Sequence, residues 1–128
     1  MIQKESFRPK LVLMSTPIFK VVSRDLWAPA ENDGVFNGAA IDLTDGFIHF
    51  STAGQVVETV SKHFAGRTDL LLVTVDPEKL GDQLKWEISR GGELFPHLYG
   101  ELEMSAVTSV VELPIGPDGR HVIPSFKT

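Results

Sequence analysis

Short runs of β-forming residues, each stopped within a few positions by Pro, Gly or Asp, constrain the fold of this chain more than any other feature. Predicted strands cover residues 18–22, 47–51, 70–75, 84–88 and 107–113. Only two or three short helices separate them, and strands do not alternate regularly with long helices. The pattern predicts an α+β fold with a small β-core and disfavours a doubly wound parallel sheet.

Capping residues predict where two of the helices begin and end. Ser23 is a suitable N-cap for a helix that Pro29 and the Asn-Asp-Gly turn after it are expected to end. Thr52 with Gln55 three positions later fits a capping box, and apolar residues follow at helical spacing. Gly66 stands where the C-cap of this second helix is expected.

Turn signals divide the rest of the chain. Residues 44–46, Thr-Asp-Gly, predict a turn, and residues 95–100 predict an irregular aromatic loop. We expect residues 1–16 to form a flexible lead-in, residues 17–113 a single globular domain, and residues 114–128 a peripheral tail.

Composition narrows the function classes. The chain has no cysteine, which excludes disulfides, thiolate catalysis and thiolate metal ligands. Its longest apolar runs have four residues, whereas a membrane-spanning helix needs about 20 and a signal peptide about 7–15. The sequence therefore predicts a cytoplasmic protein without a membrane segment.

The charge distribution disfavours nucleic acid as a partner. Twelve basic and seventeen acidic side chains give a net charge of −5. Residues 1–24 contain five basic side chains and one acidic side chain, so the whole acidic excess lies in residues 25–128. A protein that neutralises phosphates along a nucleic acid shows a basic stripe instead.

His49 and Ser51 are the first candidate site residues. On a strand, side chains two positions apart share a face, so both point the same way as Phe47. Their Cβ atoms then lie roughly 7 Å apart, which suits two groups that grip one ligand. Ser51 and Thr52 precede a helix, where free N–H groups favour anions such as phosphate. The alternative is a half-buried histidine bonded to backbone beside a serine that only caps the helix.

His97 and Tyr99 are the second candidate pair. They lie two positions apart on the predicted 95–100 loop, and loops on a rigid scaffold often carry sites. The alternative is that Phe95 and Leu98 plug the core and leave His97 partly exposed.

Glu87 lies on the polar face of a predicted strand. If that face lines a cleft, Glu87 suits a sugar hydroxyl or a developing cation; otherwise it is an ordinary surface glutamate. With His49 and His97 it would complete a two-His-one-carboxylate set, but no His-x-His or His-Glu-x-x-His spacing supports a metal site. His63 and His121 are expected to be incidental. No P-loop or Gly-x-Gly-x-x-Gly motif is present.

Two specific segments carry a family resemblance. The chain resembles the bacterial and plant family called domain of unknown function 952 over roughly residues 17–113, most clearly in Gly46-Phe47-Ile48-His49-Phe50-Ser51 and Phe95-Pro96-His97-Leu98-Tyr99-Gly100. That family in turn is similar in fold to the ADP-ribosyltransferases and the tRNA 2′-phosphotransferases. The resemblance implies a split, strongly bent β-core whose cleft takes NAD without a Rossmann motif.

The resemblance also implies roles for the candidate residues. His49 and Ser51 would contact a ribose or phosphate, with Thr52 and Lys20 also assigned to ligand binding. Placing Glu87, His97 and Tyr99 beside them is a hypothesis of proximity and not a motif match. In that hypothesis the catalytic group is His49, Glu87, His97 and Tyr99: His97 and Tyr99 would flank a base or nicotinamide, and Glu87 would stabilise oxocarbenium-like charge. The arginine cluster of the RNA phosphotransferases is missing from these motifs, so removal of an RNA 2′-phosphate is disfavoured.

Three functions therefore stay open. The first is an ADP-ribosyltransferase-like cleft that binds NAD or another nucleotide, with NAD as the one cofactor considered and no metal. The second is a non-catalytic module that binds a small molecule or a protein. The third is a hydrolase with a histidine general base. The sequence does not fix the oligomeric state.

Overall fold

The computed structural model describes residues 16–124, and all its strand pairs are antiparallel. The first sheet has the order β1-β4-β8, the second β3-β6-β5, and β2 pairs with β7 alone. The strands are β1 (Ile18–Ser23), β2 (Val35–Phe36), β3 (Ile48–His49), β4 (Leu70–Val75), β5 (Leu84–Ile88), β6 (Leu94–Leu98), β7 (Leu102–Glu103) and β8 (Val107–Glu112).

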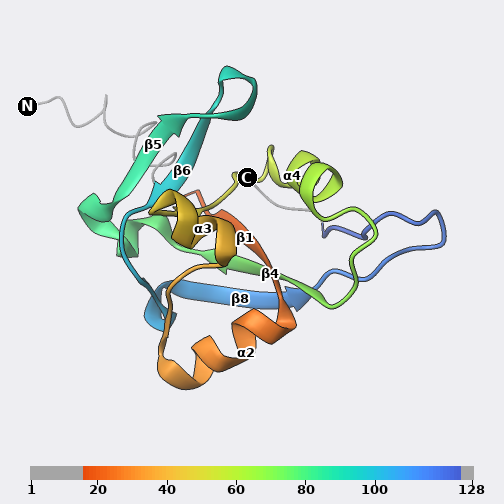
Figure 1. The fold of residues 1–128 in the computed structure, drawn as a ribbon, viewed down its shortest axis with the longest axis horizontal. Coiled ribbons are helices and arrows are strands. Elements are labelled where there is room, and N and C mark those ends of the chain that lie inside the picture. The colour runs from red at the N-terminus through yellow and green to blue at the C-terminus, as the bar shows by residue number, and fades with distance from the viewer. Residues whose placement is uncertain (1–15, 125–128) are drawn as a thin grey trace, which may run out of the picture.

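Three short α-helices and four 3₁₀ turns connect these strands, which confirms the α+β class (Figure 1). The α-helices are α2 (Arg24–Asp33), α3 (Ala40–Asp45) and α4 (Val56–His63). The 3₁₀ turns are η1 (Pro77–Lys79), η2 (Gly81–Gln83), η3 (Arg90–Gly92) and η4 (Met104–Ala106). No helix in the described part of the chain has the length and apolar character needed to cross a membrane.

A single bridge joins the two larger sheets. The N–H of Phe19 donates to the carbonyl of Ser51, and the N–H of Ser51 donates to the carbonyl of Phe19, both over 2.8 Å. Before Ser51, β3 pairs with β6 and not with β1, and after Ser51 the chain turns into α4. The β-core is therefore split, with an open fork along one edge of β1.

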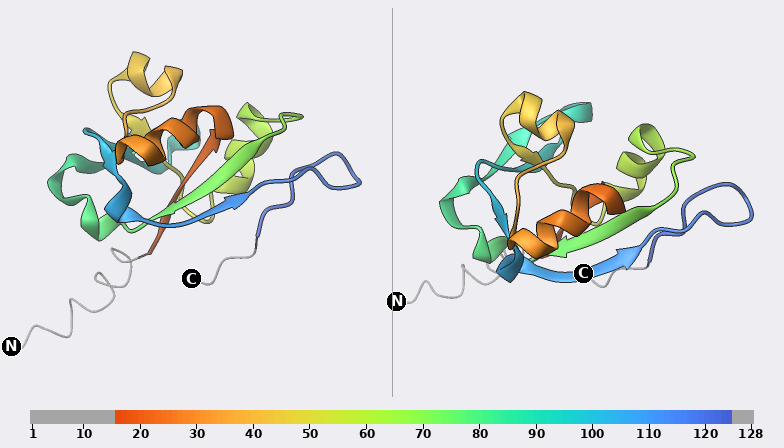
Figure 2. Two further views of the ribbon diagram at one scale, coloured as in Figure 1. Left: turned by 90° about the horizontal axis from the view of Figure 1, so that it is seen from below. Right: turned by 60° about the horizontal axis from the view of Figure 1, so that its bottom comes forward.

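The apolar side chains form two clusters on opposite faces of the first sheet. β4 is buried on both faces, as expected of a central strand. Figure 2 shows α2 beside this sheet, where its Trp27 and Ala30 join the larger cluster. α4 packs with the smaller cluster: Phe19, Val21, Val56, Val60, Leu70, Leu72 and Leu113.

The first helix continues through the proline that was expected to end it. Ser23 Oγ accepts from the N–H of Leu26 at 3.4 Å, which confirms the predicted N-cap. Pro29 lies inside α2, which ends only at Gly34, in the left-handed conformation with φ 85°. Pro29 removes one helical hydrogen bond, but the buried Trp27 on its N-terminal side and the two caps hold the helix.

Two segments predicted to be irregular are regular. The turn expected at residues 44–46 is the end of α3, which Gly46 closes with φ 88°. The loop expected at residues 95–100 is mostly β6, paired on both sides. Pro96 has no N–H, and it is tolerated because that side of the residue faces β3 where the β3 ladder ends; its carbonyl on the same side accepts from the N–H of Phe50 at 3.0 Å.

The predicted domain limits stay predictions. The lead-in at residues 1–16 lies outside the described residues except for Thr16. In the C-terminal segment, Ile115 and His121 form an isolated β-bridge, and Ile123 packs against the smaller apolar cluster.

Candidate functional site

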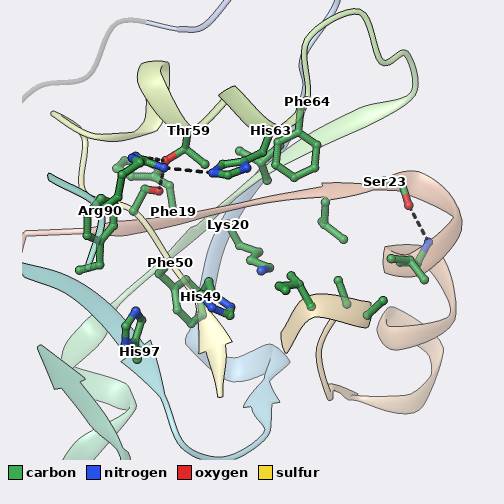
Figure 3. A pocket seen from close by; sticks show the side chains of 18 of the residues that line it. Phe19, Lys20, Ser23, His49, Phe50, Thr59, His63, Phe64, Arg90 and His97 are labelled. Carbon is green, nitrogen blue, oxygen red and sulfur yellow. Dashed lines mark hydrogen bonds between the residues drawn. The ribbon is translucent and has the colours of Figure 1, made fainter. Parts of the chain in front are cut away.

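A pocket of about 880 Å³ occupies the fork between β1 and β3. Residues 19–23 of β1 form its floor, and residues of α3 and α4 form its sides (Figure 3). Its volume lies within the roughly 300–1,000 Å³ of small-molecule sites. The pocket is thus a direct consequence of the split between the two sheets.

A buried ion pair stands under one side of the pocket. Lys20 Nζ lies 2.9 Å from Asp42 Oδ2 and 3.1 Å from Asp42 Oδ1, with both side chains almost completely buried. Asp42 also accepts from the N–H of Ala39 at 2.7 Å and from the N–H of His49 at 3.1 Å. This carboxylate therefore ties α3 to both β1 and β3.

Burial and charge oppose each other in this pair. Burial acts to raise the pKa of the Asp42 carboxyl, but the His49 hydrogen bond, the Lys20 charge and the Ala39 N–H together lower it to about 2. Burial lowers the pKa of Lys20, and the charge of Asp42 works against that shift. The carboxylate of Asp42 is thus ionised and can only accept hydrogen bonds.

Both ring nitrogens of His49 face carboxylates. Nδ1 lies 2.6 Å from Asp42 Oδ1, and Nε2 lies 3.0 Å from Asp45 Oδ2. Since the Asp42 oxygen only accepts, Nδ1 carries a proton and donates it to this bond. A ligand that bonds to Nε2 must first displace Asp45.

His97 has a different set of partners. Its Nδ1 lies 2.7 Å from Glu87 Oε1, and the Tyr99 hydroxyl donates to the same oxygen at 2.8 Å. Hydrogen bonds from His97 and Tyr99 lower the pKa of Glu87, and the bond to Glu87 raises the pKa of Tyr99. Phe47 stacks on the His97 ring with the centroids 4.1 Å apart, which fixes the ring from one face.

The second nitrogen of His97 is accessible. Nε2 has no hydrogen-bond partner within residues 16–124, and no fully buried side-chain nitrogen or oxygen there lacks a partner. Although its side chain is only 6% exposed, Nε2 is therefore not fully buried, and His97 is one of the residues that line the pocket. An imidazole bonded to a carboxylate at Nδ1 and open at Nε2 is the arrangement that general acid–base catalysis uses.

A cationic and hydroxyl-bearing group lies at the α4 side of the pocket. Arg90 comes from the turn between β5 and β6, where Gly91 has φ 69°. Its guanidinium contacts Thr59 Oγ1 at 3.1 Å and His63 Nε2 at 3.2 Å. Thr59 Oγ1 also hydrogen-bonds Ser51 Oγ at 2.9 Å. Figure 3 shows these contacts beside Phe19.

The structure brings together part of the set assigned from sequence. The pocket is lined by Lys20, His49, Ser51 and His97. Glu87 contacts His97, Tyr99 contacts Glu87, and neither lines the pocket. Thr52 also lies outside it, and its N–H donates to Gln55 Oε1 at 3.0 Å. That bond is one half of the predicted capping box; the N–H of Gln55 donates to the Thr52 carbonyl and not to its hydroxyl, and the N-cap of α4 is Gln55.

Sequence reasoning missed other residues. His63, expected to be incidental, lines the pocket, as do Arg67 and Arg90. Asp42 was assigned no role, although a carboxylate before a Gly-terminated turn suggests a helix N-terminus. Arg90 directly precedes the Gly91-Gly92 turn, and no motif in the sequence marks it.

Comparisons with known proteins identify relatives. Crystal structures of protein CC0527 from Caulobacter crescentus and of a double mutant of that protein are 48% and 47% identical to this chain, each with a TM-score of 0.80. Each match covers 84% of this chain and 94% of the other. The solution NMR structure of CC0527 gives a TM-score of 0.74 at 48% identity, covering 82% and 90%. No curated protein sequence matches.

The family model agrees with these relatives. The model described as "protein of unknown function (DUF952)" matches residues 21–110, which span the pocket from β1 to most of β8. The chain belongs to the DUF952 family.

Proposed function

We propose that the pocket binds a small phosphorylated ligand of the nucleotide class, NAD or a part of it among them. The observation that carries the proposal is the charge of the lining. Arg67 and Arg90 line the pocket with three histidines, and no Asp or Glu is among the lining residues of the described chain. Lys20 also lines it, but Asp42 already balances its charge. In a chain with a net charge of −5, this local reversal favours an anionic ligand.

The apolar part of the lining suits a planar ring. Phe19, Phe50 and Phe95 are buried core residues whose faces border the pocket. A base or nicotinamide ring buries apolar area against such side chains while its polar edge needs hydrogen bonds. The ligand therefore combines a ring with an anionic group.

The open edge of β1 offers those hydrogen bonds. Phe19 directs its N–H and carbonyl away from β4 toward Ser51. In an antiparallel strand alternate residues point the same way, so the N–H and carbonyl of Val21 also face the fork. A donor and an acceptor on one residue match an amide or the edge of a base.

We assign the proton-transfer role to His97. Glu87 hydrogen-bonds Nδ1 of His97 at 2.7 Å, so Nε2 is the nitrogen that would contact the ligand. Glu87 and Tyr99 reach the ligand only through this imidazole, so both are positioning residues in this proposal. His49, held by Asp42 and Asp45, orients the ligand or its neighbours instead. If His97 takes its proton from water, the same pair would support a hydrolase, which is the second candidate.

Isothermal titration calorimetry with NAD, ADP-ribose, AMP and adenosine tests the proposal. We expect the phosphorylated ligands to bind in the micromolar to millimolar range and adenosine to bind more weakly. The pocket variant Arg67→Gln should weaken binding of the phosphorylated ligands. Arg120→Gln removes the same charge from an exposed residue outside the pocket and should leave binding unchanged. An absence of heat with every ligand at millimolar concentration, or unchanged binding by His49→Ala, would contradict the proposal.

Turnover separates the candidate reactions. Incubation with NAD followed by chromatography detects release of nicotinamide, and His97→Asn should abolish any release while leaving the dissociation constant within a few-fold. Binding without turnover in the wild-type protein would support the non-catalytic module instead.

A further inference from the structure

We propose that Arg90, His63 and Thr59 form a phosphate subsite at the α4 side of the pocket. The identity of the whole ligand rests on the proposed function, but the subsite itself is argued from its own contacts. Figure 3 shows the three side chains converging across α4 and the β5–β6 turn. Arg90 and the Thr59 hydroxyl would hold a phosphoryl or diphosphoryl group, and His63 would position Arg90.

The partners of Arg90 orient its charge without cancelling it. Nη2 donates to the Thr59 hydroxyl, and Nη1 lies 3.2 Å from His63 Nε2. A guanidinium has only donors, so His63 Nε2 is the acceptor in this contact and carries no proton. Both partners are neutral at the contacting atom, and the positive charge remains available to an anion.

No carboxylate pairs tightly with Arg90 within the described residues. The nearest recorded carboxylate oxygen, Glu58 Oε1, lies 3.9 Å away, and the same side chain faces Lys62 at 3.6 Å. Glu58 is 58% exposed, so solvent screens this contact. By contrast, Arg24 outside the pocket has a carboxylate oxygen of Glu112 at 2.8 Å.

Arg90 is also held in place before a ligand arrives. Its guanidinium carbon lies 4.9 Å from the centroid of the Phe95 ring, a cation–π contact on a buried residue. The side chain is 24% exposed, which leaves part of it open to the pocket. A planar donor fork that is already oriented loses little entropy when it binds phosphate oxygens.

The hydroxyls link this subsite to the histidines. Thr59 Oγ1 and Ser51 Oγ share a hydrogen bond of 2.9 Å, and either can turn its proton toward a phosphate oxygen. Ser51 is two residues from His49 on the extended chain, or roughly 7 Å between their Cβ atoms. A phosphate at Arg90 therefore places the next group of the ligand beside the paired histidines.

Inorganic pyrophosphate is the probe for this subsite. Titration of the full chain at constant ionic strength, followed by two-dimensional ¹H–¹⁵N NMR, should shift the amides of Thr59 and His63 and the Nε–H of Arg90 with one saturating curve. Arg90→Gln should weaken this binding about tenfold or more, as expected for loss of a charge-assisted pair. Arg120→Gln, an exposed arginine in the C-terminal segment, is the matched control and should change it less than about twofold.

The outcomes separate the subsite from the proposed function. The subsite is overturned if the chemical shifts of the wild-type protein do not saturate with pyrophosphate, or if Arg90→Gln shows the same shift changes. If the variant fails to fold, the wild-type titration alone decides. Pyrophosphate binding at Arg90 without binding of any nucleotide keeps the subsite and overturns the nucleotide proposal. Nucleotide binding that pyrophosphate does not compete with, and that Arg90→Gln leaves unchanged, overturns the subsite alone.

Discussion

His49 and His97 lie directly opposite each other on β3 and β6, and each imidazole is anchored through Nδ1 by its own carboxylate. Their ring centroids are 5.4 Å apart. The two rings differ at Nε2, which faces Asp45 in His49 and has no hydrogen-bond partner within residues 16–124 in His97. Two histidines in equivalent register therefore differ in their surroundings: both ring nitrogens of His49 contact carboxylates, and only one ring nitrogen of His97 does.

The first prediction concerns the tautomer of His97. The ionised carboxylate of Glu87 accepts from Nδ1–H, so in its neutral form His97 should be protonated at Nδ1 and unprotonated at Nε2. In Glu87→Gln the side-chain amide can donate to Nδ1, and we expect a mixture of both tautomers. Long-range ¹H–¹⁵N NMR of the imidazole measures this directly. Glu101→Gln, an exposed control, should leave the His97 tautomer unchanged, and a pure Nδ1–H form in Glu87→Gln would contradict the prediction.

The second prediction uses the single tyrosine of the chain. The hydrogen bond to Glu87, with smaller contributions from burial and from the Glu87 charge, raises the pKa of Tyr99 above its usual 10.0. Tyrosinate absorbance during an alkaline titration should therefore appear at higher pH than in the unfolded chain. Because the raised pKa favours the neutral phenol, this contribution to stability is complete below the unfolded pKa and is lost as the pH rises through the folded one. Glu87→Gln should lower the midpoint, whereas an unchanged midpoint would argue against the bond.

Local patterns in the sequence predicted the parts of the fold that depend on local chemistry. β4 matches its predicted limits because six consecutive β-forming residues fill a strand buried on both faces. The alternation at residues 47–51 also holds: Ile48 and Phe50 lie in the core, and His49 lines the pocket. In such segments the residue types alone decide which face is buried.

The remaining features depend on contacts between distant residues. α3 has six residues, of which Asp42 is the buried one, so it lacks the apolar periodicity that reveals a helix. The partner of Asp42, Lys20, lies 22 residues away, and Arg90 lies 27 residues from His63. Only the assembled fork brings these side chains together, and no local pattern encodes their distances.

The third prediction concerns Gly38, which precedes α3. Its φ of 122° is unfavourable for other residues, and a Cβ there would lie 2.8 Å from the Cβ of Asp42. Gly38→Ala should destabilise the protein by about 3 kcal/mol, because the helix must shift to relieve both the strain and the clash. Chemical denaturation measures the loss, and the His49 ring resonances should shift as Asp42 moves.

Gly34→Ala is the matched control for this change. Gly34 also has a left-handed conformation, with φ 85°, but a Cβ there would meet no atom within 4 Å. Only the conformational cost remains, and we expect a loss of about 1 kcal/mol. Equal losses of stability in the two variants would show that the contact with Asp42 is not the reason that residue 38 requires glycine.

The last prediction is the pH dependence of the Lys20–Asp42 pair. The pKa of Asp42 is about 2 in the folded protein against 3.8 as a free side chain. A depressed acid contributes stability that is present above the unfolded pKa and is lost as the pH falls through the folded one. Asp42→Asn should therefore lower the free energy of unfolding by about 3 kcal/mol near neutral pH, since it also leaves the Lys20 ammonium buried and unpaired.

The difference in the free energy of unfolding between wild type and Asp42→Asn should then decrease as the pH falls from about 4 to about 2. Urea denaturation at a series of pH values measures it. Asp45→Asn is the control, because Asp45 is 39% exposed and its side chain bonds His49 within the described residues. That variant should lose less than about 1 kcal/mol. A constant difference between wild type and Asp42→Asn over this pH range would mean that the carboxylate does not titrate with folding, and that the charge of Lys20 is balanced elsewhere.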